Sequence, residues 1–363
     1  MLGVYIHIPF CKNICNYCDF CKMNYNEKYT KNYLNNLKKE ILSRYKGEKI
    51  DTLYMGGGTP TSLTLEELEY LLEITNIFNK EDNIEFTIES NIEDMDINKI
   101  NLLKSYGVNR ISFGVESFNK ESLNILGRTH TKEEIFDTID LTKKYFSNIN
   151  IDLIYGATDN IDTLKEDIHN FLLLDIPHIS CYSLILEKNT KLYNDKFTPI
   201  SEDIDYEMYN YIKEELKKNG YNHYEISNYA KKGYESIHNK IYWLNESYYG
   251  FGLGAVSYIN NYRISNTKNL SKYLEDNFIF ENNYENEQTR KENGLMLGLR
   301  LIDGINYLDY NKKYNTNILE KEIIKKLIND NKLEIIDNNI RIPSKYIYLS
   351  NTILSEIIGS DQL

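Results

Sequence analysis

The sequence predicts an α/β fold, in which a partial barrel of six β-then-α units, (β/α)6, precedes a small, mainly helical C-terminal domain. Short apolar runs rich in β-branched residues alternate with segments of helical periodicity through the first half of the chain. Such units in succession indicate a parallel sheet with right-handed crossovers. After residue 233 the alternation stops, and Tyr, Asn and Gly become frequent.

We expect the six strands at residues 4–8, 52–55, 83–89, 110–115, 149–155 and 178–186. The helices between and after them are expected at residues 24–45, 65–78, 97–105, 131–145, 164–174 and 203–218. Folds of this kind bind their ligands at the carboxyl ends of the strands. Residues that end or follow a strand are therefore the candidate site residues.

Three segments are expected along the chain. Residues 1–233 would form the barrel, residues 234–285 a connecting segment, and residues 286–363 the C-terminal domain. We expect a linker in the Asn-, Glu- and Tyr-rich stretch 276–288, and strands around residues 333–342.

Composition and charge exclude several classes of protein. The 363 residues are 41% hydrophobic and 26% charged, which is ordinary for a globular protein. The net charge of −12 argues against nucleic acid as a partner, because no domain-wide basic field can meet phosphates. No secretory signal and no apolar run of about 18 residues is visible. We therefore expect a cytoplasmic protein, with peripheral membrane contact and homodimer formation both left open.

Four of the five cysteines fall within eleven residues, directly after the first expected strand. Cys11, Cys15 and Cys18 have the spacing C-x3-C-x2-C, and thiolates are suited to iron–sulfur clusters. The alternative is a structural zinc site, which usually needs a second pair of ligands. No such pair stands out, since Cys181 is alone. Cys21 is interpreted as a bystander, with a role as a switchable ligand left open.

Polar groups stand at the ends of the other expected strands. A Gly-rich turn, GGGTPT, follows the second strand at residues 56–61 and would let backbone amides approach a ligand. Glu89 and Glu116 end the third and fourth strands, and Asp152 lies within the fifth. Each carboxylate, taken singly, is more simply interpreted as a solvated surface group. Taken together, the three converge on one opening at the carboxyl ends of the strands. Arg128 could pair with a ligand carboxylate or be an ordinary surface arginine.

Six segments stand in the order and spacing of a known family. They are YIHIPFC at 5–11, GGGTPT at 56–61, IESN at 88–91, SFGVESF at 112–118, DLIYG at 152–156 and LGLRL at 297–301. With them the chain resembles the radical S-adenosylmethionine (SAM) superfamily and, within it, the oxygen-independent coproporphyrinogen III oxidase-like group. The resemblance covers most of the chain.

The resemblance implies a [4Fe–4S] cluster on Cys11, Cys15 and Cys18, with SAM bound at the open iron. An electron donor such as flavodoxin or ferredoxin would supply the electron that splits SAM into methionine and a 5′-deoxyadenosyl radical. The residues that the resemblance places around SAM are Tyr5, Tyr17, Gly57, Gly58, Thr59, Glu89, Glu116, Arg128 and Asp152. Glu116 stands where relatives often have Gln.

Within this group two functions compete. One is the oxidase itself, which decarboxylates coproporphyrinogen III to protoporphyrinogen IX, and the other is the HemW-type heme chaperone branch. Two features favour the chaperone: Phe20 stands where the oxidase has a further cysteine, and the first strand begins by Val4 without a long preceding extension. A radical enzyme acting on another tetrapyrrole is a third, weaker alternative.

The third feature that favours the chaperone is the motif HNKIYW at residues 238–243, which resembles the chaperones' heme motif. His238 would contribute an axial ligand to heme iron, and Tyr242 and Trp243 would offer flat faces to the porphyrin. The alternative is a structural histidine in a packed aromatic cluster. Two departures weaken the resemblance: Val256 replaces a usual His, and Ala157-Thr158 replaces a usual Leu-Pro. The implied activity is heme transfer to client heme proteins.

Overall fold

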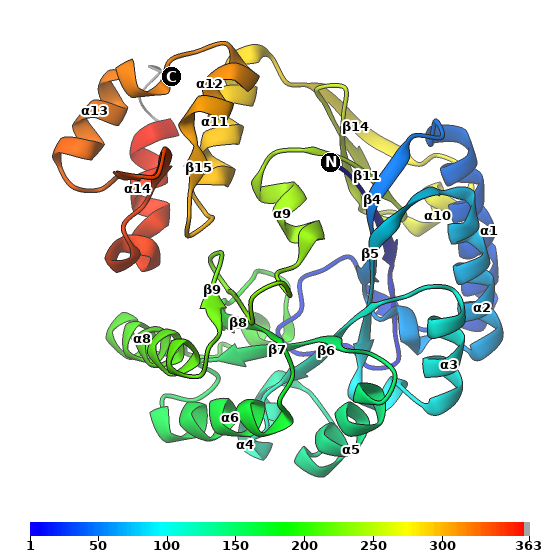
Figure 1. The fold of residues 1–363 in the computed structure, drawn as a ribbon. Coiled ribbons are helices and arrows are strands. Elements are labelled where there is room, and N and C mark those ends of the chain that lie inside the picture. The colour runs from blue at the N-terminus through cyan, green and yellow to red at the C-terminus, as the bar shows by residue number, and fades with distance from the viewer. Residues whose placement is uncertain (359–363) are drawn as a thin grey trace.

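A single curved sheet forms the body of the molecule in the computed structural model, which describes residues 1–358. The six expected strands are present and lie side by side in chain order (Figure 1). They are β1 (Leu2–Ile8), β4 (Lys49–Gly57), β5 (Asn79–Asn91), β6 (Arg110–Glu116), β7 (Asn148–Tyr155) and β8 (His178–Ser183). Every neighbouring pair among them is parallel, so the predicted (β/α)6 half-barrel is confirmed.

The six expected helices cover the outer face of this curved sheet (Figure 1). They are α1 (Glu27–Arg44), α2 (Leu65–Ile74), α3 (Ile97–Ser105), α5 (Lys132–Lys143), α6 (Ile161–Leu174) and α8 (Glu202–Lys218). Two short helices, α4 (Lys120–Leu126) and α7 (Lys191–Asn194), lie in the loops that follow β6 and β8.

Alternation along each strand separates an apolar face from a polar one. In β6, Ile111 and Phe113 are buried in the core under the helices, whereas Ser112 and Glu116 line a pocket inside the curve. Because successive side chains point to opposite faces, one short strand contributes both to the core and to the site.

The sheet extends beyond the six expected strands at both ends. β11 (Ser247–Phe251) pairs parallel with β1, and the antiparallel strands β12 (Val256–Ile259), β13 (Tyr262–Asn266) and β14 (Ile279–Tyr284) continue from it. β10 (Asn228–Ala230) and β9 (Asn222–His223) extend the other end. The expectation of a simple linker at residues 276–288 was therefore wrong, because β14 forms there by pairing with β13.

One short helix, α9 (Ile237–Trp243), lies on the inner side of the sheet, against β1 and β4 (Figure 1). Glu85 of β5 accepts hydrogen bonds from the backbone N–H groups of Ile237 at 2.9 Å and His238 at 2.8 Å. A carboxylate at a helix N-terminus satisfies amides that have no partner within the helix. This contact attaches the start of α9 to β5.

The C-terminal part has a core of its own, which includes Leu295, Ile324, Leu327 and Leu354. Its helices are α11 (Glu287–Gly298), α12 (Tyr307–Tyr314), α13 (Glu322–Asn329) and α14 (Ser350–Ile358). β15 (Ile305–Asn306), β16 (Glu334–Ile336) and β17 (Asn339–Arg341) form a small sheet, which confirms the strands expected around residues 333–342. This part lies beside the open side of the half-barrel (Figure 1).

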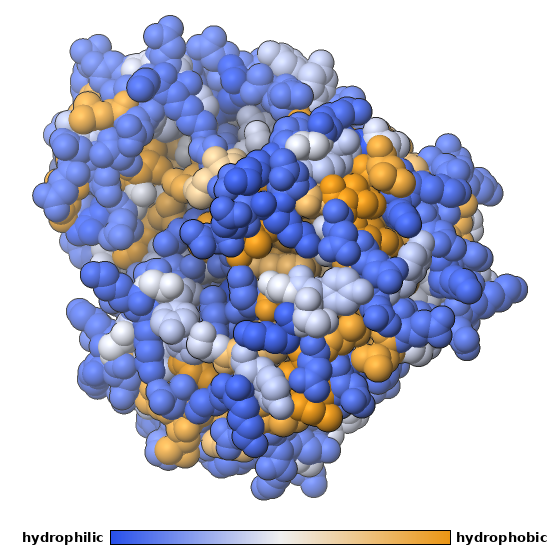
Figure 2. All heavy atoms as spheres, turned by 45° about the vertical axis from the view of Figure 1, so that its right-hand side comes forward, coloured by the Kyte–Doolittle hydropathy of each residue, from blue (hydrophilic) through white to orange (hydrophobic). Residues whose placement is uncertain are grey.

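Hydrophilic side chains cover most of the face seen in Figure 2, and apolar ones form separate patches among them. Within residues 1–358 no helix is both long and apolar enough to span a membrane.

The buried carboxylate of Glu40 joins α1 to the added strands, and its removal is expected to destabilise the barrel. It accepts hydrogen bonds from Gly252 N at 2.9 Å, Tyr273 Oη at 2.7 Å and Asn266 Nδ2 at 2.7 Å, and it pairs with Arg44. Glu40→Ala leaves the Arg44 charge without its partner, so the free energy of unfolding should fall by about 3–5 kcal/mol. Urea denaturation measures the loss. Glu73→Ala, at an exposed position of α2, is the control and should change stability by less than about 0.5 kcal/mol.

Candidate functional site

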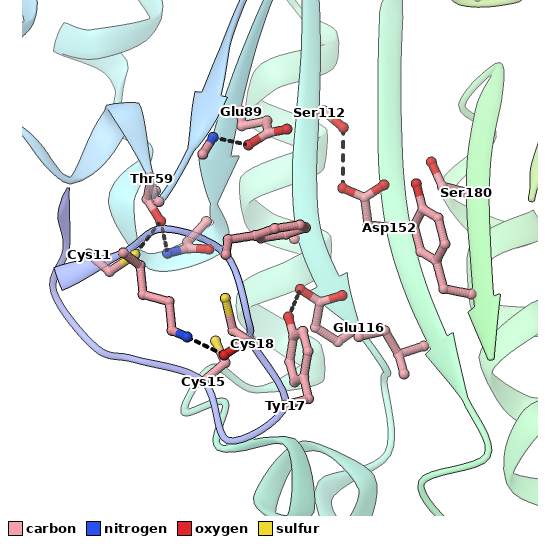
Figure 3. A pocket seen from close by; sticks show the side chains of 18 of the residues that line it. Cys11, Cys15, Tyr17, Cys18, Thr59, Glu89, Ser112, Glu116, Asp152 and Ser180 are labelled. Carbon is pink, nitrogen blue, oxygen red and sulfur yellow. Dashed lines mark hydrogen bonds between the residues drawn. The ribbon is translucent and has the colours of Figure 1, made fainter. Parts of the chain in front are cut away.

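The predicted cofactor residues meet in one pocket at the carboxyl ends of the strands (Figure 3). The pocket is lined, among others, by Cys11, Cys15, Tyr17, Cys18, Gly57, Gly58, Thr59, Glu89, Glu116, Arg128 and Asp152. Of the residues expected around the cluster and SAM, Tyr5 alone does not line it. Tyr5 instead packs against Tyr54 of the pocket wall, with ring centroids 6.1 Å apart.

Hydrogen bonds from the backbone and from one side chain hold the cysteine loop in place at the pocket. At the base of the loop, β2 (Phe10–Cys11) pairs with β3 (Met23–Asn24), which brings the two ends of the loop together. In its middle, Asn16 donates from its backbone N to Leu126 O and from Nδ2 to Ile125 O, both at 2.9 Å. Gly127 is required beside it, because φ is +78° and a Cβ there would lie 2.8 Å from the Asn16 side chain.

The three thiols of this loop are free and point toward the same cavity (Figure 3). Arg128 Nη1 lies 3.4 Å from Cys15 Sγ, and Thr59 Oγ1 lies 3.8 Å from Cys11 Sγ. Burial raises the pKa of Cys11 to about 12 and that of Cys18 to about 11. Both thiols are therefore protonated at neutral pH until a metal displaces the protons.

The three thiols are not arranged as a site for one metal ion. Within residues 1–358 no three His, Cys, Asp or Glu side chains lie close enough together to hold a single metal ion. In a [4Fe–4S] cube each thiolate binds a different iron, so its ligands need not converge on one point. With three cysteines in one loop, one iron would have no protein ligand from this loop.

Glu89 is held deep in the pocket wall by two donors. Tyr54 Oη donates to Oε1 at 2.7 Å, and the backbone N of Gly57 donates to Oε2 at 3.0 Å. Burial, with the charge of Asp152 acting in the same direction, raises the pKa of Glu89 to about 7. A Cβ at Gly56 would lie 2.6 Å from this carboxylate, so glycine is needed there to leave room.

Glu116 and Asp152 complete a set of three buried carboxylates. Glu116 Oε1 accepts from Tyr17 Oη at 2.8 Å, and its backbone has a φ of +65°, which is unusual for a non-glycine residue. Burial raises the pKa of Glu116 to about 7. Asp152 accepts from Asn150 Nδ2 at 3.0 Å and from Ser112 Oγ at 3.3 Å, and burial raises its pKa also.

Arg128 supplies positive charge beside the cysteine loop. The residue is 7% exposed, and Nη1 donates to Asn91 Oδ1 at 2.9 Å, while Nη2 donates to Gly114 O at 2.5 Å. Its Nε is buried and has no hydrogen-bond partner within residues 1–358. A guanidinium in this state can donate to a ligand carboxylate.

Sequence reasoning missed several residues that line the pocket, among them Tyr54, Asn91, Arg110 and Asn150. Tyr54 and Asn150 stand at inward positions of their strands, so the period-2 pattern could have placed them on the pocket side. Arg110 is 2% exposed, and its charge opposes the rise in the pKa of Glu89.

The residues of the HNKIYW motif lie together on α9 but do not present a free imidazole. His238 is 1% exposed, with Nδ1 at 2.7 Å from Thr52 Oγ1 and Nε2 at 2.8 Å from Tyr242 Oη. Trp243 is half-buried, with the guanidinium of Arg300 at 5.9 Å from its ring. A bond from either ring nitrogen of His238 to iron would require one of these hydrogen bonds to break. Its assignment to heme stays a prediction.

Cys21 lies outside the set of residues that line the pocket. A Cβ at Gly254 would come within 3.3 Å of its Sγ, so the thiol packs against the turn before β12. Its backbone O is 2.6 Å from His7 Nε2. The interpretation of Cys21 as a bystander stays a prediction.

A free three-cysteine loop after the first strand of a parallel half-barrel, facing buried carboxylates, defines a radical SAM protein. The family model of the Radical SAM superfamily matches residues 5–169. Proteins named heme chaperone HemW are similar over nearly the whole chain. The one from Lactococcus lactis is 38% identical over 99% of this chain and 98% of its own, and the one from Bacillus subtilis is 34% identical over 99% and 100%. The chain belongs to the HemW family of radical SAM proteins.

The fold comparison agrees with this result. The structure of the coproporphyrinogen III oxidase HemN from Escherichia coli superposes with a TM-score of 0.87, over 99% of this chain and 90% of that chain, at 21% identity. At this identity the likeness establishes the fold alone. Superfamily membership implies a [4Fe–4S] cluster and SAM, and the three thiols, the buried carboxylates and the partly unpaired Arg128 fit both groups.

Replacement of any one of Cys11, Cys15 and Cys18 by Ala should abolish the cluster, since each thiolate would bind a separate iron. The loss of the cluster is measured from the iron and sulfide content and from the EPR spectrum after anaerobic reconstitution. The matched control is Cys21→Ala, which should still bind about four irons per chain. Loss of the cluster in the Cys21 variant would contradict the three-cysteine assignment.

The affinity for SAM is expected to fall as the pH is lowered from 8 to 6. Glu89 and Glu116 both have a pKa raised to about 7, so below that pH they become neutral and attract a cationic ligand less. Protonation of one such carboxylate weakens SAM binding by up to about tenfold per pH unit. Anaerobic calorimetric titration measures the slope, and Glu89→Gln and Glu116→Gln should each remove part of it. A pH-independent affinity in the unmodified protein would refute this explanation.

Proposed function

We propose that this protein is a heme chaperone, which binds heme and delivers it to client heme proteins with a [4Fe–4S] cluster and SAM as cofactors. The observation that carries the proposal is the likeness to heme chaperones over 99% of the chain. Within this function, the residues of the pocket would have separate roles.

Cys11, Cys15 and Cys18 would hold the cluster, and Arg128 would donate to the carboxylate of SAM. Glu89, Glu116 and Asp152 would accept hydrogen bonds from its polar groups and offset its positive charge. When bound, the cluster and SAM together supply one-electron chemistry, which the protein confines by excluding water from the pocket.

The mouth of the pocket offers an apolar surface for a porphyrin. Four of its lining residues are exposed apolar side chains: Ile14 at 41%, Phe20 at 65%, Tyr182 at 41% and Ile185 at 68%. Exposed apolar groups gathered at one place mark a binding surface, and an aromatic ring favours contact with a flat conjugated ligand. We propose that the macrocycle lies against this mouth surface, beside the cluster loop.

The second candidate function is coproporphyrinogen III decarboxylation, which the likeness in fold to HemN favours. Against it, Phe20 stands at the position of the oxidase's further cysteine, and its side chain is 65% exposed. Anaerobic incubation with coproporphyrinogen III distinguishes the two functions, since a chaperone forms no protoporphyrinogen IX.

The surroundings of this activity are also proposals. We propose a cytoplasmic location and an electron donor such as flavodoxin or ferredoxin. Peripheral membrane contact and a homodimer would each be compatible with transfer of heme to a client.

Anaerobic hemin titration of the cluster-loaded protein should show saturable binding of about one heme per chain. The double variant Phe20→Glu with Ile185→Glu should weaken hemin binding at least about tenfold, because each apolar contact contributes about 1.5–3 kcal/mol. The matched control is Leu173→Glu, which alters a side chain 59% exposed on α6, outside the pocket. Absence of specific hemin binding in the unmodified protein would overturn the chaperone function, whereas equal binding by all variants would overturn only the location.

A further inference from the structure

His238 lies between two elements that reach the SAM pocket, although it is not in the pocket itself. Its imidazole stacks on the ring of Tyr54, with centroids 5.0 Å apart and planes inclined by 27°. Its two ring nitrogens lie against Thr52 Oγ1 of β4 and Tyr242 Oη of α9, so the ring is held at both edges. Burial lowers the pKa of His238 to about 3, which keeps the ring neutral.

Tyr54 has one ring face against His238 and lies near Tyr5 as well. The Tyr5 ring is 6.1 Å from that of Tyr54 and inclined by 33°. Tyr5 Oη is 2.9 Å from His7 Nδ1, and the other nitrogen of His7 meets the cysteine loop at Cys21 O. The ring of Tyr54 is therefore held by contacts with Tyr5 of β1 and with His238 of α9.

The hydroxyl of Tyr54 is what connects this packing to the pocket. It donates to Glu89 Oε1 at 2.7 Å, and the other carboxylate oxygen is taken by the backbone of Gly57. A rotation of the Tyr54 ring would withdraw one of the two donors of Glu89. The next residue of the motif, Asn239, itself lines the pocket, so α9 also forms part of its wall.

A second buried histidine has an equivalent arrangement on the other side of the barrel. His178 Nδ1 lies 2.6 Å from Asn150 Oδ1, and His178 Nε2 lies 2.8 Å from Tyr224 Oη. Asn150 Nδ2 in turn donates to Asp152 Oδ1 at 3.0 Å. Two carboxylates of the pocket are thus each oriented by a residue that a buried histidine contacts.

We propose that His238 of the HNKIYW motif is a positioning residue for the SAM site: it holds Tyr54, and through Tyr54 the Glu89 carboxylate, in the orientation that receives SAM, and it does not ligate heme iron. This inference rests on the proposed function only in placing SAM in the pocket. It assigns the motif to the cofactor site in place of heme.

The geometry opposes heme ligation by this residue. The ring is enclosed between β4 and α9, and both of its nitrogens are engaged. Gly3 of β1 closes one side, since a Cβ there would lie 3.4 Å from His238 Cε1. Access for a macrocycle would require α9 to leave the sheet, and with it the two amide contacts to Glu85.

The test is a double-mutant cycle on SAM affinity, measured by anaerobic calorimetric titration and by the SAM-induced change in the EPR spectrum of the reduced cluster. His238→Ala and Tyr54→Phe should each weaken SAM binding about tenfold, the loss of one hydrogen bond to a charged group. The double variant should also lose only about tenfold, because both act through the same hydroxyl. Additive losses, or an unchanged affinity in His238→Ala, would overturn the proposal.

The matched control is His223→Ala. His223 also stacks on a tyrosine, Tyr229, at 4.3 Å, and bonds a carbonyl, Ile226 O, but neither neighbour lines the pocket. This variant should keep the SAM affinity of the unmodified protein. An equal loss there would mean that removal of any packed histidine loosens the barrel, and the specific role of His238 would be rejected.

Hemin titration of the same variants separates this proposal from the proposed function. His238→Ala should bind hemin with unchanged stoichiometry and an unchanged Soret spectrum. If hemin binding or the Soret spectrum changes while SAM affinity does not, His238 is an axial ligand and the inference is overturned, but the chaperone function stands. If neither the variants nor the unmodified protein bind hemin, the chaperone function fails. The SAM measurements still decide the role of His238 in that case.

Tyr242→Phe provides a milder change in case His238→Ala does not fold. It removes the partner of His238 Nε2 and leaves the ring in place. A positioning role predicts a loss of SAM affinity of about two- to fivefold and no change in hemin binding. A heme-ligand role predicts unchanged SAM affinity and equal or tighter hemin binding, because Nε2 becomes free, and that result would overturn the proposal.

Discussion

The parallel pairing of β1 with β4 through β8 is the constraint on which the site depends. In a parallel sheet all carboxyl ends lie at one edge, so the cysteine loop after β1 necessarily faces groups carried by β4, β5, β6 and β7. Cys15 meets Arg128 and Tyr17 meets Glu116 although about a hundred residues separate each pair. The helices on the outer face make this possible, because they bury the apolar side of every strand and leave the polar side for the pocket.

The second constraint is electrostatic. Glu89, Glu116 and Asp152 are buried together, and burial disfavours their charged forms. Within the described residues the pocket also holds Arg110 and Arg128, which offset part of this negative charge. A cationic ligand with several hydrogen-bond donors would satisfy the remainder, and SAM has that character. The pocket wall and SAM are therefore complementary in charge and in hydrogen bonding.

The motif on α9 shows how the same residues can support two interpretations. As a sequence, HNKIYW offers an imidazole next to two aromatic rings, which is suitable for heme. In the folded chain the imidazole is enclosed by Thr52, Tyr242 and Tyr54, and its neighbour Asn239 lines the pocket. The contact from His238 through Tyr54 to Glu89 turns a motif remote from the cysteine loop into a support for the cofactor site. The surface that we propose for a macrocycle, the exposed apolar side chains at the mouth, does not involve this motif.

The sequence by itself determined the order of strands and helices, the three-cysteine loop and most of the groups that face it, because these depend on local periodicity and on residues that directly follow strands. Family motifs added the cofactor residues and the HemW family. Only the tertiary structure decided the rest. β11 and β14 formed in segments without a clear alternating pattern, because pairing with an existing strand stabilises them. The positions of Tyr54, Arg110 and Asn150, and the closed state of His238, depend on which side chains meet across the barrel, and local sequence carries no record of those contacts.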